Sequence, residues 1–225
     1  MKRKTKTLAI IPARGKSKRL KGKNLLCLGP DTLLEHSIKY ALANRDIIDK
    51  IIVSTDDENI KKKALLYDVE VINRPEDLAT DTATTADALL HVLESIDELF
   101  DNIILLQPTN PLRPGDLLKN SFKIFRKEQH DSLFTVSLNN QKFGKIDNGI
   151  FKPFNYVPGQ RSQDLEPLFY ENGLLYIARV DAVKKGDLIS EKSFPYVVEH
   201  PFAQVDIDLQ EDLDFADFLY KKYYE

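Results

Sequence analysis

Short runs of consecutive apolar residues alternate along the chain with longer segments in which apolar residues recur every three or four positions. Continuous runs predict four buried strands, at residues 7–12, 50–55, 69–72 and 102–106. Helical periodicity predicts four helices, at residues 33–42, from 56 onward, at 84–99 and at 116–127. Continuous apolar strands separated by helices are typical of a parallel sheet that is covered on both faces. The pattern therefore predicts an α/β fold with a Rossmann-like, doubly wound, mostly parallel sheet.

The regular alternation of predicted strands and helices ends in the second half of the chain. Three further strands are predicted, at residues 134–138, 174–178 and 204–209. Residues 139–167 are rich in glycine, proline, asparagine and glutamine, and a closing helix begins at Glu211. No stretch reads as a linker between two domains. We therefore expect one domain over residues 1–225, with an inserted lobe at about residues 139–170.

Composition narrows the class of protein. Apolar residues make up 42% and charged residues 30% of the 225 positions, which is typical of a soluble globular protein. The net charge of −3 gives no global argument for binding nucleic acid or a membrane surface. The single cysteine, Cys27, excludes an intrachain disulfide, and no apolar stretch approaches the roughly 20 residues of a membrane span. We expect a cytoplasmic protein that binds neither nucleic acid nor membrane.

A basic loop follows the first predicted strand, over residues 12–24. In open α/β sheets the loop after the first strand lies where ligands bind. Gly15 and Gly22 allow the backbone to approach a ligand closely, and the segment carries six cationic side chains. Such a loop suits a triphosphate, with a solvated basic loop as the alternative. Its spacing matches neither of the two common glycine-rich nucleotide motifs, GxxxxGK[ST] and GxGxxG.

Two aspartates, Asp206 and Asp208, are separated by one residue in the last predicted strand. Residues two apart in a strand project to the same face, and two neighbouring carboxylates repel each other unless a cation lies between them. Hard oxygen ligands suit Mg²⁺, which also keeps waters and shares phosphate oxygens of a substrate. The pair is therefore a candidate Mg²⁺ site, with solvent-facing aspartates at a strand end as the alternative.

A polar, proline-rich loop at residues 107–113 follows the fourth predicted strand. Gln107 offers both a donor and an acceptor, and Arg113 could bind a carboxylate through two hydrogen bonds. The alternative is a turn fixed by its prolines, with Arg113 at the surface. The four histidines are scattered and no serine or cysteine lies beside a base, so neither zinc nor covalent catalysis is supported.

Taken in order, these segments resemble the acylneuraminate (CMP-sialic acid) cytidylyltransferase family over about residues 8–216. The stretches that carry the resemblance are IPARG with SK and KN at residues 11–24, NRP with DTATT at 73–85, LQPT with PLR at 106–113, RSQDL with ENG and YI at 161–177, and DID with EDL at 206–213. The resemblance implies a fold of the nucleotide-diphospho-sugar transferase type. Lys16 stands where the family usually has a second glycine.

The resemblance also implies a reaction. The family couples CTP to the anomeric hydroxyl of a nonulosonic acid, a nine-carbon acidic sugar such as neuraminic, legionaminic or pseudaminic acid, and releases pyrophosphate. Mg²⁺ is the implied cofactor. The inserted lobe is implied to support a homodimer and to reach across to the partner's site. A Kdo-type cytidylyltransferase, or a nucleotide-binding module without activity, are the alternatives.

Residue roles follow from the same resemblance. The nucleotide-binding residues would be Ala13, Arg14, Gly15, Ser17, Lys23, Asn24, Arg74 and Thr84. The sugar-binding residues would be Gln107, Lys142, Arg161 and Tyr176. The catalytic residues would be Asp206 and Asp208, which hold the metal, together with Arg14 and Lys18, which neutralise the leaving pyrophosphate.

Overall fold

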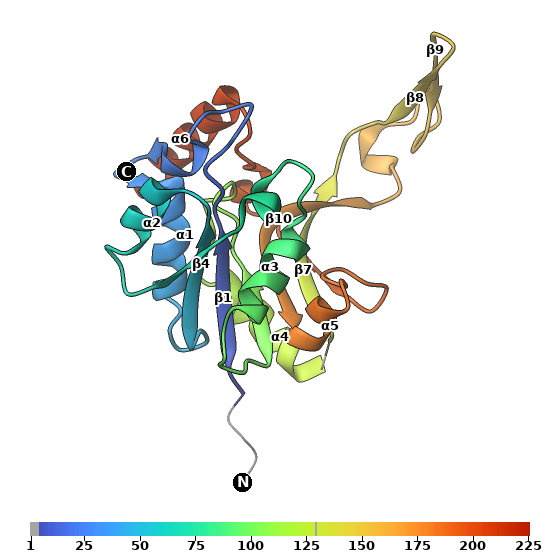
Figure 1. Ribbon diagram of the computed structural model, residues 1–225. Helices are drawn as coiled ribbons and strands as arrows, with labels where there is room; N and C mark the ends of the chain where they lie inside the picture. The colour runs from blue at the N-terminus through green and yellow to red at the C-terminus, as the bar shows by residue number, and fades with distance from the viewer. Residues whose placement is uncertain (1–4, 129) are drawn as a thin grey trace.

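A seven-stranded sheet forms the centre of the molecule in the computed structural model, which describes residues 5–128 and 130–225 (Figure 1). In sheet order the strands are β11 (Phe194–Val197), β7 (Ser132–Asn139), β10 (Leu168–Arg179), β6 (Asn102–Leu105), β1 (Thr7–Pro12), β4 (Lys50–Thr55) and β5 (Glu70–Asn73). β10 runs antiparallel to β6 and β7, and the other neighbouring strands of this sheet pair in parallel. This arrangement confirms the predicted mostly parallel α/β fold.

Alternate residues of the central strands pack against opposite layers of helices. In β1, Ala9 and Ile11 face one layer, and Leu8 and Ile10 face the other. The first layer contains α1 (Leu33–Leu42), α2 (Glu58–Ala64) and α4 (Leu117–Glu128). The second contains α3 (Thr85–Glu94) and α5 (Val180–Lys184). Because both faces of each strand are buried, the strands appear in the sequence as continuous apolar runs.

A third apolar cluster lies beyond the carboxyl ends of the parallel strands, where α6 (Gln210–Tyr224) closes the chain. Ala216 and Leu219 of α6 pack there with Phe202 and Ile207. The cluster also contains Leu28 of the short hairpin formed by β2 (Cys27–Leu28) and β3 (Asp31–Thr32). This packing brings residues 205–209, the aspartate segment that carries Asp206 and Asp208, to the same edge of the sheet as the basic loop. None of the described helices is long and apolar enough to cross a membrane.

Residues 204–209 do not form the predicted strand. Gln204 is the last residue of a short 3-10 helix, η4 (Pro201–Gln204), and several N–H groups of the following residues donate to partners outside a sheet. The Ile207 N–H donates to the carbonyl of Thr109 at 2.8 Å. The N–H groups of Asp208 and the next residue both donate to Asp212 Oδ2. Ile207 is still buried while Asp208 is not, so the expected alternation survives without a strand.

Other elements differ from the prediction mainly in length. Helix α3 ends at Glu94, five residues earlier than predicted, where the Ser95 hydroxyl donates to the carbonyl of His91. β10 is 12 residues long, because its first part pairs with β7 beyond the predicted core segment. The edge strand β11 was not predicted, since it is short and contains Pro195.

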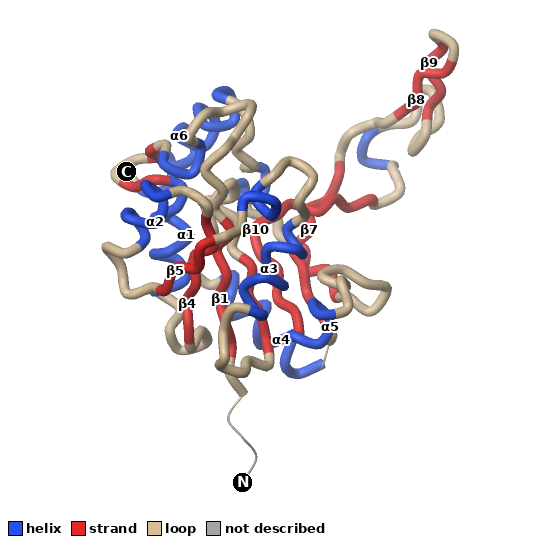
Figure 2. Tube along the Cα trace, in the orientation of Figure 1, coloured by secondary structure: helices blue, strands red, loops and turns tan. Residues whose placement is uncertain are grey.

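The segment predicted as an inserted lobe leaves the body as an extended arm (Figures 1 and 2). The arm contains the antiparallel hairpin of β8 (Gly144–Asp147) and β9 (Ile150–Pro153) and the 3-10 helix η3 (Ser162–Asp164). Ile146 and Ile150 near the hairpin tip are 78% and 64% exposed. The arm therefore presents apolar side chains to solvent instead of packing them on the sheet.

Gly173 allows β10 to pass very close to the loop after β6. The register between β10 and β7 shifts between Glu171 and Tyr176, and Gly173 within this bulge has a φ of 76°. A Cβ at this position would lie 2.8 Å from Asn110 Oδ1. Asn110 donates to the carbonyls of Asn172, at 3.1 Å, and Val205, at 2.8 Å. The glycine thus lets one amide join β10 to the aspartate segment.

Replacing Gly173 with alanine should lower the free energy of unfolding by about 2–4 kcal/mol, because the left-handed backbone and the contact with Asn110 both oppose a Cβ. Gly186 is the matched control, with a φ of 84° and no atom within 4 Å of its Cβ position. Gly186→Ala should cost only about 1 kcal/mol. Urea unfolding of both variants gives the comparison, and equal losses would show that the contact with Asn110 carries no cost.

Candidate active site

A cleft of about 630 Å³ opens where the carboxyl ends of the parallel strands meet. Nine of the residues predicted for the site line it: Arg14, Ser17, Lys18, Lys23, Asn24, Arg74, Thr84, Gln107 and Asp208. They come from five segments that are far apart in the sequence. Such an edge is the usual ligand site of open α/β sheets.

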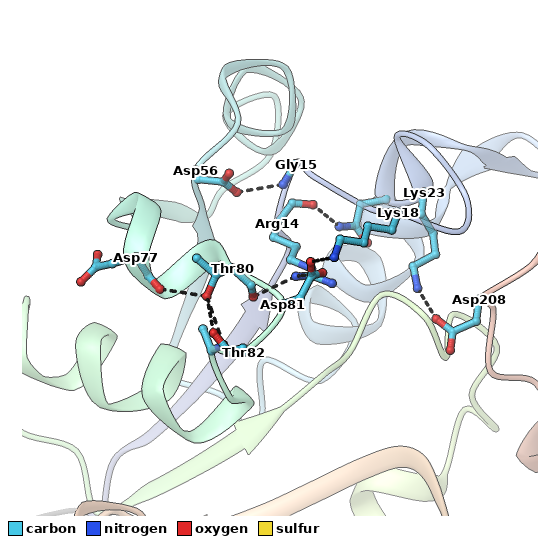
Figure 3. Close-up of polar contacts among 12 residues, drawn as sticks. Arg14, Gly15, Lys18, Lys23, Asp56, Asp77, Thr80, Asp81, Thr82 and Asp208 are labelled. Carbon is cyan, nitrogen blue, oxygen red and sulfur yellow. Dashed lines mark hydrogen bonds and ion pairs between the residues drawn. The ribbon is translucent and has the colours of Figure 1, made fainter.

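One peptide unit of the basic loop, between Arg14 and Gly15, is fixed at both ends. Its carbonyl oxygen accepts a hydrogen bond from Asn24 Nδ2 at 2.9 Å, and its N–H donates to Asp56 Oδ1 at 2.8 Å (Figure 3). A Cβ on Gly15 would lie 2.6 Å from the Cβ of Asp57, so the loop needs a glycine there. The two hydrogen bonds fix the orientation of this peptide, which sets the direction in which the Arg14 side chain enters the cleft.

Asp81 pairs with two cations of the basic loop across the cleft (Figure 3). Arg14 Nη1 lies 3.0 Å from Asp81 Oδ1, and Lys18 Nζ lies 2.5 Å from Asp81 Oδ2. Arg14 Nη1 also donates to the carbonyl of Thr80 at 2.9 Å. The hydrogen bond from Lys18, followed by the charges of both cations, lowers the pKa of Asp81. The carboxylate is therefore charged and holds the two cations together.

Asp208 pairs with two further cations of the loop. Arg19 Nη2 lies 2.5 Å from one carboxylate oxygen, and Lys23 Nζ lies 2.7 Å from the other. Partial burial alone would raise the pKa of Asp208, but the hydrogen bonds and charges of Lys23 and Arg19 outweigh it and lower the pKa. Asp206 has a raised pKa, because neighbouring protein atoms displace water and the negative charge of Asp208 is close. The two carboxylates therefore differ in how readily they take a proton.

Arg74 and Thr84 form part of the cleft wall. Arg74 is buried, and its Nε and Nη2 donate to the hydroxyl and the carbonyl of Ser54 at 3.1 and 2.7 Å. Burial lowers the pKa of Arg74, while the charge of Asp56 acts in the opposite direction. Thr84 is the N-cap of α3, and its hydroxyl exchanges hydrogen bonds with Asp87. Hydrogen bonds to β4 and α3 thus hold the side chains of Arg74 and Thr84 in place.

Arg113 takes neither of the two positions considered for it. The side chain is buried and donates to three acceptors, the carbonyls of Leu174 and Gln107 at 2.7 and 2.8 Å and the hydroxyl of Ser37 at 3.2 Å. Within the described part of the chain it forms no ion pair with a carboxylate. Burial lowers its pKa to about 10, so it remains charged at neutral pH. Arg113 thus fixes the backbone from which the Gln107 side chain enters the cleft.

Six predicted site residues do not line the cleft: Ala13, Gly15, Lys142, Arg161, Tyr176 and Asp206. The Ala13 side chain is fully buried in the core, and its N–H donates to the carbonyl of Ser54. Tyr176 is buried below the cleft and its hydroxyl donates to Glu171, a carboxylate on the same strand. Asp206 is exposed as a residue, although protein atoms still surround part of its carboxylate. The exposed Lys16 side chain does not line the cleft either.

Lys142 and Arg161 belong to the arm, which extends away from the body of the chain (Figure 1). Lys142 Nζ donates to the carbonyl of Gln160 and lies 5.3 Å from the ring centre of Tyr156. Arg161 makes two hydrogen bonds with Asp164, at 2.7 and 3.0 Å. Neither of these cations lines the cleft that Gln107 lines.

Sequence reasoning missed three residues that shape the site: Asp56, Asp81 and Arg19. Asp56 directly follows β4, the parallel neighbour of β1. The rule that places ligand loops at carboxyl strand ends could therefore have identified it. Asp81 and Arg19 lie in stretches that the sequence singled out, but nothing local indicated that each would pair across the cleft.

The solved structure of CMP:2-keto-3-deoxy-manno-octonic acid synthetase complexed with CTP has the same fold as this chain. It superposes with a TM-score of 0.72 at 17% sequence identity, covering 97% of this chain and 99% of that one. The Cytidylyltransferase family model matches residues 8–224. The chain therefore belongs to the cytidylyltransferase family.

Two relatives match over nearly their full length. Pseudaminic acid cytidylyltransferase of Campylobacter jejuni is 31% identical over 230 residues, covering 98% of both proteins. CMP-N,N'-diacetyllegionaminic acid synthase of Legionella pneumophila is 33% identical over 214 residues, covering 89% of this chain and 90% of the relative. These matches confirm the family and the class of enzyme that the sequence predicted.

Replacing Asp56 with alanine should weaken CTP binding about 10-fold, because the Gly15 N–H loses its acceptor and the peptide that aims Arg14 is freed. Asp56→Asn keeps an oxygen acceptor at the same place and should recover most of the affinity. Glu58→Gln is the control. Glu58 lies two residues after Asp56 and is exposed, so this variant removes a nearby charge without removing the hydrogen bond to Gly15. Calorimetric titration with CTP checks all three variants. Equal weakening by Asp56→Asn and Asp56→Ala would point to the charge of Asp56 and not to its hydrogen bond.

Proposed function

We propose that this chain transfers the cytidylyl group of CTP to the anomeric hydroxyl of a nonulosonic acid and releases pyrophosphate. The observation that carries the proposal is the cleft itself, in which four cations of one loop face two carboxylates at the carboxyl edge of the sheet. Two relatives that match over most of their length are named for pseudaminic acid and N,N'-diacetyllegionaminic acid. An acid of this class is therefore the proposed acceptor.

In the proposed reaction the acceptor oxygen attacks the α-phosphorus of CTP in line with the leaving group. The bond between the α-phosphorus and the bridging oxygen breaks, pyrophosphate leaves with that oxygen, and the acceptor hydroxyl loses its proton. Arg14 and Lys18 would neutralise the leaving pyrophosphate. Positioning and charge stabilisation are sufficient for such a transfer, so the chain needs no nucleophile of its own.

We propose Mg²⁺ as the cofactor, held by Asp206 and Asp208. Hard carboxylate oxygens suit this ion, and a site with two protein ligands leaves room for phosphate oxygens and water. Among the described residues no group of three or more histidine, cysteine or acidic side chains forms a closed metal site. When bound, Mg²⁺ would supply positive charge at the α-phosphate. Asp208 would then release Lys23 and Arg19, which become free to contact phosphate oxygens.

Pyrophosphate release with CTP tests the function and the acceptor together. Assays with neuraminic, legionaminic, pseudaminic and Kdo acids should give turnover with at least one of the three nonulosonic acids, and much less with Kdo. A preference for Kdo would overturn the proposed acceptor class. No pyrophosphate release with any acid would favour the alternative of a nucleotide-binding module without activity.

The Asp208→Asn variant, assayed with the preferred acid, should lose at least about 100-fold in rate, because it removes a carboxylate from the proposed metal site. Asp214→Asn is the control, since Asp214 lies on α6, is exposed and accepts a hydrogen bond from Gln210 on the same helix. Circular dichroism should show both variants folded. Near-normal turnover of Asp208→Asn would exclude the proposed metal ligand.

We also propose that the chain forms a homodimer through its arm. In the β8–β9 hairpin, Ile146 pairs with Phe151 on one face, and Lys145 pairs with Lys152 on the other. Ile146 and Phe151 are 78% and 51% exposed. An exposed apolar face on a projecting hairpin suits contact with a second copy of the chain. Each arm would then bring Lys142 and Arg161 to the partner's cleft.

Replacing Ile146 with aspartate should convert the dimer into a monomer, because it places a charge in the centre of the proposed apolar contact. Lys145→Asp changes the opposite face of the same hairpin and should leave the dimer intact. Sedimentation velocity measures both. A monomeric wild-type protein, or a dimer that survives Ile146→Asp, would contradict the proposed interface.

The cytoplasm is the proposed location, since the proposed reaction consumes CTP, a nucleotide of that compartment.

A further inference from the structure

Asp81 is held in the cleft by its own loop and not only by the cations that it contacts. The Thr80 hydroxyl donates to the carbonyl of Asp77 at 3.2 Å, and the same hydroxyl accepts from the N–H of Ala83 at 3.2 Å. Thr84 then begins α3 with a capping box. The turn that carries Asp81 is thus held by its own hydrogen bonds and by the start of α3, so the backbone position of Asp81 does not depend on the cations.

Asp81 and Asp208, the two carboxylates that bind the basic loop, differ in whether a new partner becomes available to them when a nucleotide binds. Asp208 has a proposed new partner, Mg²⁺, once Lys23 and Arg19 turn to the phosphates. Asp81 has no such replacement, since neither of the two proposed metal ligands contacts it. Binding of phosphate by Arg14 and Lys18 would therefore remove both ionic partners of Asp81 and leave its charge close to the phosphates.

We propose that Asp81 competes internally with the β- and γ-phosphates for Arg14 and Lys18 and thereby sets the selectivity of the cleft for ligands. It would hold both cations while the cleft is empty, yield them to an incoming triphosphate and recapture them as pyrophosphate leaves. This inference rests on the proposed function, in which these two cations bind the leaving phosphates.

CTP, pyrophosphate and CMP differ in how strongly they compete with Asp81 for Arg14 and Lys18. CTP brings several negative charges to Arg14 and Lys18 and is held at its base and α-phosphate as well, so it can displace one carboxylate. Pyrophosphate alone has only the β- and γ-phosphate contacts and is opposed by Asp81 throughout. CMP lacks these phosphates and does not compete with Asp81. The carboxylate therefore weakens retention of the product pyrophosphate while leaving CMP unaffected.

A residue that served only to hold the loop would have the opposite effect. Its loss would loosen Arg14 and Lys18 and weaken the binding of every phosphate ligand. Loss of an internal competitor strengthens binding of ligands with β- and γ-phosphates instead. The sign of the change therefore separates the two roles.

Replacing Asp81 with asparagine tests the inference by calorimetric titration with Mg²⁺-pyrophosphate, CTP without acceptor, and CMP. Two exposed ion pairs are lost, so pyrophosphate and CTP should bind roughly 3- to 10-fold more tightly, and CMP should change less than about 2-fold. In steady-state assays pyrophosphate should become a correspondingly stronger product inhibitor. Weaker or unchanged pyrophosphate binding by Asp81→Asn would overturn the inference.

Asp77→Asn is the matched control for charge. Asp77 lies in the same loop, is exposed, and its carboxylate points away from the cations (Figure 3). This variant removes the same charge from the loop and should bind pyrophosphate like the wild type. If Asp77→Asn strengthens pyrophosphate binding equally, the total negative charge of the loop causes the gain, and not the contact of Asp81 with the two cations.

Arg14→Gln separates failure of this inference from failure of the proposed function. If Arg14→Gln weakens pyrophosphate binding while Asp81→Asn does not strengthen it, the phosphate site stands and the role of Asp81 is wrong. If Arg14→Gln leaves pyrophosphate binding unchanged, the phosphate site lies elsewhere and both proposals fail. In the Arg14→Gln background the gain from Asp81→Asn should shrink, because one of the two contested cations is gone.

Discussion

The buried guanidinium of Arg113 ties together the elements on which the cleft is built. A charge inside a protein is costly unless its hydrogen-bonding groups are satisfied. Here the charge is met by two carbonyls, a hydroxyl and the ring of Tyr40, whose centre lies 5.5 Å from the guanidinium carbon. These partners belong to α1, to the loop after β6 and to β10. Any shift of one of these elements would leave a buried donor without its acceptor.

Asn110, three residues earlier in the same loop, extends this network to the aspartate segment. Through its two hydrogen bonds the segment at Val205 is attached to β10. The loop after β6 therefore orients Gln107 and also anchors the segment that carries Asp208. Its prolines limit backbone freedom, which suits a loop that has to hold several elements at fixed distances.

The sequence predicted the sheet well, because strands buried on both faces must be continuously apolar. It was wrong about residues 204–209, where alternating burial is real but Asp212 and Thr109 supply the backbone partners that a neighbouring strand would have supplied. Most segments predicted to form the site do meet in one cleft, since parallel strands end at one edge, but the arm that carries Lys142 and Arg161 does not line it. The position of Asp56, directly after β4, could have been identified from the sequence, but the pairing of Asp81 with the basic loop could not, because it depends on a contact between loops that no local pattern records.

β10 gives the molecule a mechanical property. This single strand begins in the arm at Leu168, passes the bulge at Gly173, and ends in the body at Arg179. Along the way its carbonyls at Asn172 and Leu174 are held by Asn110 and Arg113. The arm is thus attached to a strand whose other end is anchored in the central sheet beside β6, next to the loop that carries Gln107. A force that bends the arm would be transmitted directly to the hydrogen bonds beneath the site.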